Sequence, residues 1–452
     1  MQMDASFVNG QGGTDKTFLY NTLLATIRSS GDIAVAVASS GIAALLIMGG
    51  RTAHSRFKIP LKLNESSTCN ISRNSKEAQL IILAKLFIWD EAPMIHKFAF
   101  EALDRTFRDI TQVDKPFGGK VFVFESDFCQ VLPVIPRASR AEVVSASLSH
   151  SSLWRHMKVM KLSINMRLLQ TNDTQENLRQ RNFAEFLLNI GDGKYPVIPD
   201  TENMIDLPSD MVITGGKLLD LIDFVYPNLI ENSSNVNYMV GRAILTPKND
   251  DIENISFQIM NLFPGEFHLY PSADSVDLTD DSNIEQPQLY SPEFLRSLKI
   301  PGFPPGELKL KVGTPIIFLR NLNPSEGLCN GTQLICRGLH NKVIDAEIIT
   351  GSYVSNCVFI SRISLTPSNT SLPFVLKRRQ FPVRVAFSMT VNKAQGQTLN
   401  HVGIYLPQPV FSHGQLYVAL SRITSHQCVK ILIDHNGQEY QTKNVVYSEI
   451  FQ

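Results

Sequence analysis

The sequence predicts an α/β fold in which helices cover both faces of parallel sheets. In the first half of the 452-residue chain, short apolar runs alternate with amphipathic segments of helical period. The last part of the chain, from about residue 385, returns to the same alternation. Because the chain is longer than one ordinary hydrophobic core allows, we expect two or three domains.

Five continuous apolar runs in the first half are typical of the buried strands of a parallel sheet. They are residues 6–9, 33–39, 85–91, 121–126 and 159–165. Residues 33–50 carry no charge, but Ser39-Ser40-Gly41 divides them into a strand and a short helix, so we expect no membrane span. Residues 56–79 are polar and follow neither period, and we interpret them as a small excursion from the sheet.

The middle of the chain is more polar, and its pattern changes. The elements expected there are helices at 182–191 and 251–262, a strand leading into a turn at 243–250, and an exposed acidic loop at 274–288. Repeated strand signals with Gly and Asn turns at 308–363 predict a small all-β module of the barrel kind. The last part then predicts a strand, a polar loop and a strand at 385–406, a helix ending in Arg422, and a closing strand at 429–434.

The charge and cysteine content of the chain limit which partners and which compartment are expected. The chain has 42 basic and 42 acidic side chains, so a nucleic-acid partner would have to be met by local basic patches. The densest is Lys377-Arg378-Arg379, which fits either nucleic-acid contact or a solvated turn. The six cysteines form no CxxC pair, which argues against a zinc site or a disulfide framework and for a reducing, intracellular compartment.

The segment GQGGTDKT, from Gly10 to Thr17, fits the phosphate-binding P-loop pattern between a predicted strand and a predicted helix. Backbone N–H groups of such a loop hold phosphate oxygens, while Lys16 would reach the β- and γ-phosphates and Thr17 would bind magnesium. Asp15 departs from the pattern, because it stands where the pattern has glycine. The alternative interpretation is a glycine-rich turn without function.

Polar residues follow three later strands, at the edge where open α/β sheets bind ligands. Asp90 and Glu91 end one strand and fit magnesium binding and activation of a water molecule, or else a solvated strand end. Asp127 and Gln130 follow the next strand, and Gln130 either senses a γ-phosphate or caps a loop. Arg167, with Asn165, follows the last, and fits either phosphate contact across a cleft or a surface ion pair.

Taken together, these stretches resemble the Pif-type (petite-integration-frequency) DNA helicases of superfamily one, particularly their plant and Helitron branch. The most specific stretches are FGGKVFVFESDFCQVLPVI, TVNKAQGQTL and FSHGQLYVALSR, and ASSGIAALLIMGGRTAHS, WDEAPM and GLCNGTQL add to them. The resemblance covers nearly the whole chain.

The resemblance implies two RecA-like domains that bind ATP and Mg²⁺ between them and single-stranded DNA across their top. The implied domains are 1–165 with a small wedge insertion at about 56–79, then 166–304 with 366–452, and an SH3-like β insertion at 305–365. The implied activity is 5′-to-3′ unwinding by a monomeric, nuclear protein that acts on single strands, forks and duplex junctions. DNA repair, recombination and telomere maintenance are the family's processes.

The resemblance also assigns residues by matching motifs. Gly10, Gly12, Gly13, Thr14, Lys16 and Thr17 would hold the nucleotide, and Thr17 and Asp90 the magnesium ion. Glu91 would act on the hydrolytic water, Gln130 on the γ-phosphate, and Arg167 and Arg422 as arginine fingers. The segments that touch DNA or couple it to the cleft would contribute Thr52, His54, Thr390, Asn392, Lys393 and Gln395.

Four departures from the family pattern lead to a second interpretation. Asp15 replaces a glycine, Glu125 and Ser126 replace small residues before Asp127, and Cys129 replaces an arginine. The family's upstream helix with its adenine-contacting glutamine is also expected to be missing. A catalytically inactive DNA-binding protein with the same fold therefore stays open. A small-molecule kinase would explain Lys16 and Asp90 but not Arg422 or TVNKAQGQ.

Overall fold

The computed structural model describes residues 5–166, 174–277, 290–323, 326–351, 353–367, 372–434 and 440–451. The chain divides into two compact units, one formed by 1–216 with 391–452 and the other by 217–390. Within the described residues, no helix combines the length and the apolar character that crossing a membrane requires.

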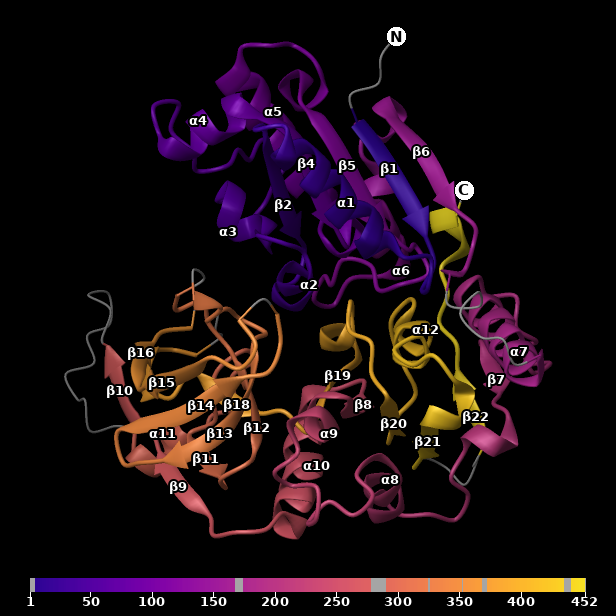
Figure 1. Ribbon diagram of the computed structural model, residues 1–452, viewed down its shortest axis with the longest axis vertical. Coiled ribbons are helices and arrows are strands. Elements are labelled where there is room, and N and C mark those ends of the chain that lie inside the picture. Colours follow the sequence, from indigo (N-terminus) through magenta and orange to yellow (C-terminus); the bar gives the residue numbers. More distant parts are fainter. Residues whose placement is uncertain are drawn as a thin grey trace. The chain divides into compact units, whose positions relative to one another are not determined.

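A six-stranded sheet with the order β3-β2-β4-β5-β1-β6 forms the centre of the first unit, and every pair in it is parallel (Figure 1). Its strands are β1 (Ala5–Gly10), β2 (Ile33–Ala38), β3 (Arg51–Thr52), β4 (Ala84–Asp90), β5 (Val121–Ser126) and β6 (Met157–Leu162). The five predicted strands are therefore confirmed, with ends shifted by a few residues. The expected burial of the fifth strand was wrong: β6 is the edge strand, and its central residues, including Lys158 and Lys161, are exposed.

Helices cover this sheet on both faces, as the alternating pattern predicts. They are α1 (Lys16–Ser29), α2 (Gly41–Leu46), α3 (Ala53–Phe57), α4 (Lys76–Leu83), α5 (Lys97–Thr111) and α6 (Arg140–Ser145). On one face, Phe57, Phe87, Phe107 and Phe122 pack ring against ring. Replacing one of these fully buried rings with Ala would cost about 3–5 kcal/mol of stability.

The polar excursion at 56–79 is tied to helix α5 and contributes Cys69 and Ala78 to the core. The Arg105 guanidinium donates to the Ser67 carbonyl, and the Cys69 amide donates to the Thr106 hydroxyl at 2.9 Å. Its lack of period reflects this loop conformation, with the helix α4 beginning only at Lys76. The wedge role stays a prediction.

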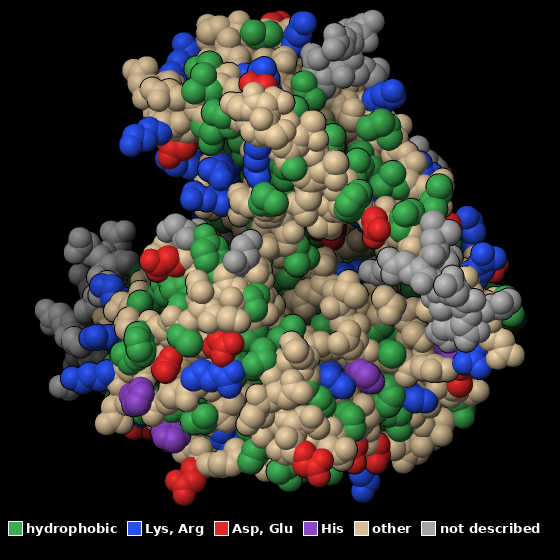
Figure 2. Space-filling model, viewed as in Figure 1, with side chains coloured by type: hydrophobic (Ala, Val, Ile, Leu, Met, Phe, Trp, Pro, Cys, Tyr) green, Lys and Arg blue, Asp and Glu red, His purple; other side chains and the backbone are tan. Residues whose placement is uncertain are grey.

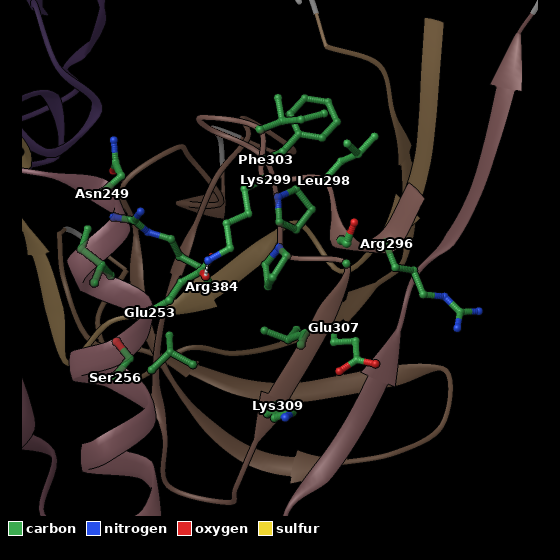
Figure 3. A pocket seen from close by; sticks show the side chains of 18 of the residues that line it. Asn249, Glu253, Ser256, Arg296, Leu298, Lys299, Phe303, Glu307, Lys309 and Arg384 are labelled. Atoms are coloured by element: carbon green, nitrogen blue, oxygen red, sulfur yellow. Dashed lines mark hydrogen bonds and ion pairs between the residues drawn. The ribbon is translucent and has the colours of Figure 1, made fainter. Parts of the chain in front are cut away.

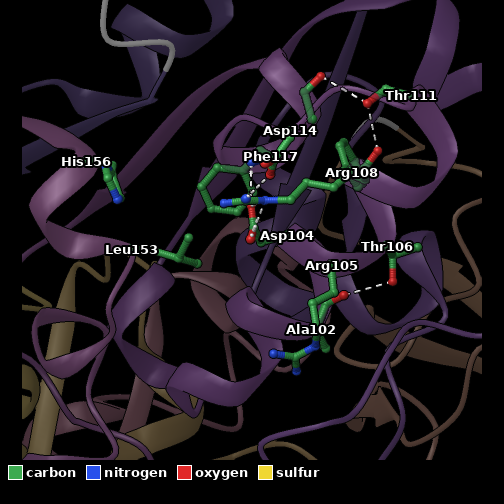
Figure 4. Close-up of polar contacts among 12 residues, drawn as sticks. Ala102, Asp104, Arg105, Thr106, Arg108, Thr111, Asp114, Phe117, Leu153 and His156 are labelled. Atoms are coloured by element: carbon green, nitrogen blue, oxygen red, sulfur yellow. Dashed lines mark hydrogen bonds and ion pairs between the residues drawn. The ribbon is translucent and has the colours of Figure 1, made fainter.

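A left-handed turn precedes β5 and fixes where that strand begins. Phe117, Gly118 and Gly119 all have positive φ angles. A Cβ atom at Gly118 would lie 2.3 Å from the Thr111 hydroxyl oxygen, so the position requires glycine. The buried Asp104 carboxylate accepts from the Phe117 amide at 2.5 Å and pairs with Arg108 (Figure 4). The turn leads directly into β5, which pairs with β1 and β4.

The rest of the first unit comes from residues 174–216 and from the C-terminal segment after residue 390. It contains α7 (Thr174–Gly191), α12 (Gln415–Leu420), the antiparallel pair β7 (Met204–Asp206) and β22 (Gln441–Lys443), and the parallel pair β20 (His401–Leu406) and β21 (Val429–Ile433). The predicted helix before Arg422 is confirmed, but it ends at Leu420, so Arg422 lies just beyond it.

The second unit combines a small α/β part with several antiparallel sheets. The α/β part consists of α8 (Leu218–Val225), α9 (Val236–Val240), α10 (Asn249–Leu262) and the parallel strands β8 (Arg242–Thr246) and β19 (Ser388–Thr390). A five-stranded sheet has the order β15-β14-β13-β12-β18. Its strands are β12 (Pro315–Phe318), β13 (Gln333–Leu339), β14 (Val343–Ile348), β15 (Cys357–Ser361) and β18 (Val383–Val385).

The remaining strands lie at the two ends of the predicted all-β range or beyond them. They are β9 (His268–Pro271), β10 (Ala273–Asp277), β11 (Glu307–Leu310), β16 (Ile363–Leu365) and β17 (Val375–Gln380), with helix α11 (Pro292–Ser297) between β10 and β11. Tyr270 and Phe381 belong to the same core as the five-stranded sheet. Strands therefore occur outside 308–363 at both ends. The SH3-like identity of the module stays a prediction.

Two interpretations of polar segments were wrong. The expected exposed loop at 274–288 begins as strand β10, and its residues 278–288 lie outside the described part of the chain. The Arg378 guanidinium does not face nucleic acid or solvent, because it is buried and pairs with the buried Asp274 carboxylate at 2.9 Å. Strand alternation leaves only Lys377 and Arg379 exposed in that basic cluster.

Candidate nucleotide-binding site

The P-loop connects β1 to α1 and takes the conformation that its glycine pattern requires. Gly10 packs so closely that a Cβ atom there would lie 2.7 Å from the Thr14 hydroxyl oxygen, and Gly13 has a φ of 91°. Asp15 has φ 52° and ψ 40°, in the left-handed region, and its side chain is exposed. The backbone at Asp15 is therefore the one a glycine would adopt, although a carboxylate has been added.

The Lys16 ammonium is held inside the loop by three oxygen atoms. It donates to the Gly10 carbonyl at 2.6 Å and the Gln11 carbonyl at 3.3 Å, and it pairs with Glu125 Oε1 at 3.3 Å. Burial alone would lower the pKa of Lys16, but the carboxylates of Glu125, Asp127, Glu91 and Asp90 outweigh burial and raise it. Its charged partner is therefore Glu125 and not the neighbouring Asp15.

Glu125 pairs with Lys16 because the register of β5 against β1 places its side chain beside the P-loop. It lies on β5 opposite Val8 of β1, two residues before the loop begins. Its side chain is fully buried, and its charged partner there is the Lys16 ammonium. Burial raises the pKa of Glu125 to about 7, with Lys16 acting in the opposite direction. The ion pair with Lys16 is therefore what offsets a costly buried charge.

Asp90 and Glu91 lie at the same carboxyl edge of the sheet, as predicted from their position at the end of a strand. Burial and the neighbouring Glu91 raise the pKa of Asp90 to about 7. Burial also raises the pKa of Glu91, although the charges of Lys16 and Arg422 oppose the change. Glu91 Oε2 is buried without a hydrogen-bond partner among the described residues. An oxygen in this state is suited to accept a hydrogen bond from a bound water.

Tyr417, which the sequence reasoning did not single out, ties three motifs together. Its hydroxyl donates to Asp127 Oδ2 at 2.5 Å and accepts from the Gly12 amide of the P-loop at 3.4 Å. Burial raises the pKa of Tyr417 well above its usual value, so it acts as a neutral donor. The signal was present in GQLYVALSR, but a tyrosine within an apolar helix is normally interpreted as core.

The two predicted motif glutamines form a buried pair. Gln395 Nε2 donates to Gln130 Oε1 at 3.2 Å, which links the TVNKAQGQ segment to the segment that follows β5. Asn392 accepts from Gln415 Nε2 at 3.3 Å, which links the same segment to α12. The residues predicted to couple DNA to the nucleotide site are therefore joined by hydrogen bonds to the residues predicted to sense phosphate.

Arg422 is buried and organises backbone. Its guanidinium donates to the carbonyls of Val418, Ala394 and Gln397 at 2.9, 3.3 and 3.2 Å. Its positive charge also acts on Glu91, where it opposes the rise in pKa that burial causes. Arg422 thus lies near the predicted hydrolytic site in a conformation that holds the 394–397 turn. Arg167, the other predicted arginine finger, lies outside the described residues.

The remaining predicted positions are more dispersed. Thr17 is exposed at the start of α1, Lys393 is half-buried beside Asn392, and Thr390 belongs to the second compact unit. Thr52 and His54 are half-buried, and burial lowers the pKa of His54, which keeps it neutral at pH 7.

Sequence reasoning missed a cluster of arginines around His54. The positive charges of Arg51 and Arg28, together with burial, lower the pKa of Arg56. Figure 2 shows basic side chains gathered on one side of this unit. The signal was present in RTAHSRF, where two arginines bracket the histidine. A like-charged cluster of this kind is a candidate contact for a polyanion.

The residues at this edge also fit a nucleotide and a magnesium ion. Among the described residues, no group of three or more His, Cys, Asp or Glu side chains is arranged to hold a metal by itself. Magnesium normally takes only one or two protein ligands and completes its shell with phosphate oxygens and water. Thr17 and Asp90 fit that partial set, Lys16 fits the phosphates, and the Glu91 oxygen that lacks a hydrogen-bond partner among the described residues fits a water molecule.

Stability should depend on pH through Glu125. Because its pKa is raised by burial, the carboxyl group stabilises the fold when protonated, and this contribution is lost as pH rises from about 4.5 to about 7. We expect the free energy of unfolding to fall across that window, and to fall less steeply in Glu125→Gln. Urea denaturation at a series of pH values measures both slopes, and equal slopes would contradict the assignment.

Residues 2–201 match the family model of the PIF1-like helicase, and residues 293–339 match that of the DNA helicase Pif1 2B domain. Two separate parts of the chain are thus similar to Pif1-like helicases. The ATP-dependent DNA helicase Pif1 of Campylobacter jejuni is 25% identical over 467 residues, which cover 99% of this chain and 91% of the relative. Human ATP-dependent DNA helicase PIF1 is 24% identical over 430 residues, which cover 94% of this chain and 58% of the relative. The chain thus spans little more than half of the human relative.

Solved structures of Pif1 helicases have the same fold. Bacteroides Pif1 bound to single-stranded DNA gives a TM-score of 0.67 at 23% identity, covering 96% of this chain and 90% of that structure. Pif1 helicase from Candida albicans gives a TM-score of 0.66 at 21% identity, covering 99% and 94%. The predicted fold class, two RecA-like domains with mixed α/β structure and parallel sheets, is therefore confirmed.

Proposed function

We propose that this chain is an ATP-dependent DNA helicase that couples ATP hydrolysis to 5′-to-3′ movement on single-stranded DNA. The observation that carries the proposal is the convergence of Lys16, Asp90 and Glu91 at the carboxyl edge of one parallel sheet, directly beside the P-loop. The names of the relatives support the same activity, and one Pif1 structure from Bacteroides is described in complex with ADP-AlF3 and single-stranded DNA.

Each residue has a role that its surroundings support. Lys16 and the loop amides of Gly12, Gly13 and Thr14 would bind phosphate oxygens, and Thr17 with Asp90 would hold Mg²⁺. The metal, when bound, would offset negative charge on the phosphates. Glu91, whose pKa is raised by burial, would accept the proton of the hydrolytic water.

Coupling to DNA would follow the buried hydrogen bonds. Gln130 would contact the γ-phosphate and transmit that contact to Gln395 through their shared hydrogen bond. Gln395, Asn392 and Lys393 lie on one short segment, so a shift at Gln130 would move the proposed DNA-contacting residues. Arg422 and Arg167 would stabilise charge on the transferred phosphoryl group. Thr52, His54 and Thr390 would complete the strand contact.

Membership of the plant and Helitron branch is supported by the motif stretches alone. The weakened P-loop is supported by Asp15 and by the Lys16–Glu125 pair. Action at forks is supported by a Pif1 structure described as unwinding forked double-stranded DNA by two coordinating helicases, and a nuclear location by the DNA substrate. An inactive remnant is not favoured, because the relatives are named as helicases and Lys16, Asp90, Glu91 and Gln130 are all retained.

Strand displacement tests the proposed activity and its polarity. We expect a duplex with a 5′ single-stranded tail to be unwound when ATP and Mg²⁺ are present, and a duplex with a 3′ tail to remain intact. Lys16→Ala should abolish unwinding, because the phosphates lose their cation. Unwinding of the 3′-tailed duplex would contradict the polarity, and unwinding that survives Lys16→Ala would contradict the site.

Binding to single-stranded DNA should weaken steeply with salt, because phosphate contacts release counterions. We expect Lys393→Ala to lower the affinity several-fold and to reduce the slope of log K against log salt concentration by roughly 0.7, the value for one phosphate contact on a single strand. Fluorescence anisotropy with a labelled oligonucleotide measures both. Exposed Lys115→Ala is the control and should leave the slope unchanged. A slope that is the same in the Lys393 variant would show that Lys393 does not contact phosphate.

A further inference from the structure

The second compact unit contains a cavity of about 660 Å³ that the proposed helicase activity does not use. Its walls are helix α10, the segment 298–306, strand β11 and Arg384 on strand β18 (Figure 3). The volume lies within the range of small-molecule sites, which are mostly apolar and carry a few polar groups. All the residues that line it belong to the same unit.

One wall of the cavity is held in place by buried bonds. The Arg378 guanidinium donates to the carbonyls of Leu295, Leu298 and Pro304 at 2.7, 3.2 and 3.1 Å, while Asp274 offsets its charge. Gly306 is required in the same wall, because a Cβ atom there would lie 2.1 Å from the Arg296 carbonyl oxygen. The cavity is therefore preformed, which reduces the entropy that a ligand would lose on ordering it.

Arg384 is the polar group without a partner in this cavity. Its Nε and Nη2 atoms are buried and have no hydrogen-bond partner among the residues that the structure describes. Burial lowers the pKa of Arg384, and Glu253 opposes that change. Glu253 itself forms an ion pair with Lys299, so it is already engaged. Figure 3 shows the side chains of Arg384, Glu253 and Lys299 together at one side of the cavity, while Arg296 points away from them.

The charges around Arg384 indicate how much negative charge a ligand can carry. Lys299 and Glu253 form an ion pair, whereas the buried Nε and Nη2 atoms of Arg384 have no hydrogen-bond partner in the described part of the chain. Three further carboxylates, of Asp250, Glu293 and Glu307, line the cavity with the cations Arg296 and Lys309, so the lining has no excess of positive charge that would favour a ligand with two negative charges. A carboxylate carries one charge and matches the guanidinium fork with two hydrogen bonds, whereas a phosphate monoester carries about 1.5 to 2 charges at pH 7.

Apolar side chains supply the rest of the lining. Phe257 on α10 is 49% exposed beside the cavity, although Phe rings are normally buried. Met260 on the same helix and Leu298 and Phe303 on the facing segment add apolar surface. Such walls suit a planar or aliphatic body of the size that a drug-like ligand has.

We propose that this cavity binds a small organic monocarboxylate, with its carboxylate on Arg384 and its apolar body between Phe257 and the segment that contains Phe303. The site lies outside the nucleotide site and does not depend on the proposed helicase activity.

Binding of two matched probes to the full chain tests this proposal. Isothermal titration calorimetry would compare 2-naphthoate with 2-naphthamide, which has the same shape and no charge. We expect the acid to bind at least tenfold more tightly, because its hydrogen bonds to Arg384 are charge-assisted. In Arg384→Gln the preference should disappear while the amide still binds. Lys309→Gln, which removes a charge from the same lining, is the control and should keep the preference within about twofold.

Phe257→Ser separates the apolar contact from the charge. Because the ring is half exposed, the variant should fold, and it should bind both probes several-fold more weakly while the preference for the acid stays. Circular dichroism checks the fold of each variant. Equal affinity for the two probes, no binding of either, or an unchanged preference in Arg384→Gln would overturn the proposal. The proposal would also be overturned if an oligonucleotide displaced 2-naphthoate and this displacement required Arg384. The cavity would then be a DNA contact.

Discussion

Glu125→Gln is expected to strengthen ATP binding by about ten- to a hundredfold. Glu125 holds Lys16 at 3.3 Å, and two unit charges at that distance attract by roughly 5 kcal/mol at an effective dielectric of 20. Only part of this is recovered, because Asp127, Glu91 and Asp90 also act on Lys16. A gain of about 1.4 to 2.7 kcal/mol corresponds to the expected range. Calorimetric titration with a non-hydrolysable ATP analogue and Mg²⁺ measures the change.

The same measurement at two pH values separates this account from a simple change of shape. Protonation of Glu125 below about pH 7 should release Lys16 in the unmodified chain. The advantage of Glu125→Gln over the unmodified chain in affinity for the analogue should therefore be smaller at pH 6 than at pH 8. Glu142→Gln is the matched control, because Gln can replace Glu in the capping box of α6. An unchanged affinity in Glu125→Gln would show that the ion pair does not restrain Lys16.

Asp15→Gly is expected to strengthen ATP binding by about a hundredfold. A carboxylate about 5 Å from a phosphate oxygen repels it by roughly 3 kcal/mol at an effective dielectric of 20. The backbone at Asp15 already has the left-handed φ of 52° that glycine adopts, and Asn tolerates this region as well as Asp does. We therefore expect Asp15→Asn to recover most of the gain, since the charge and not the backbone is the obstacle.

Titrations of Asp15→Asn and Asp15→Gly with the same analogue decide between charge and shape. If Asp15→Asn binds as weakly as the unmodified chain while Asp15→Gly binds tightly, the obstacle is steric. If neither variant differs from the unmodified chain, the exposed carboxylate points away from the phosphates. Combining Asp15→Gly with Glu125→Gln should give nearly additive gains, because the two carboxylates act on different partners, the phosphates and Lys16.

The central sheet was predictable because its strands are continuous apolar runs in the sequence, and polar residues follow each run. The exception, β6, contains Lys158 and Lys161, which a central strand would have to bury. Arg378 was misinterpreted for the opposite reason: it looked like a surface charge, and only its pairing with the distant Asp274 explains its burial. Local pattern identifies elements, but not which charges meet across sheets.

The same limit applies to the nucleotide site. Lys16, Asp90, Glu91 and Gln130 could be proposed from motifs, because each follows a strand at the same edge. That Glu125 faces Lys16 depends on the register of β5 against β1, which no local pattern shows. The hydrogen bonds from Tyr417 to Asp127 and from Gln395 to Gln130 likewise join segments that are far apart in the sequence.

The central claim is that the P-loop edge is a working nucleotide site whose turnover is coupled to DNA. The rate of ATP hydrolysis with and without single-stranded DNA tests it most directly, in the unmodified chain and in Lys16→Ala. The account predicts slow hydrolysis that single-stranded DNA stimulates and that Lys16→Ala abolishes. No hydrolysis under any condition, even in Asp15→Gly combined with Glu125→Gln, or a rate that Lys16→Ala leaves unchanged, would contradict it.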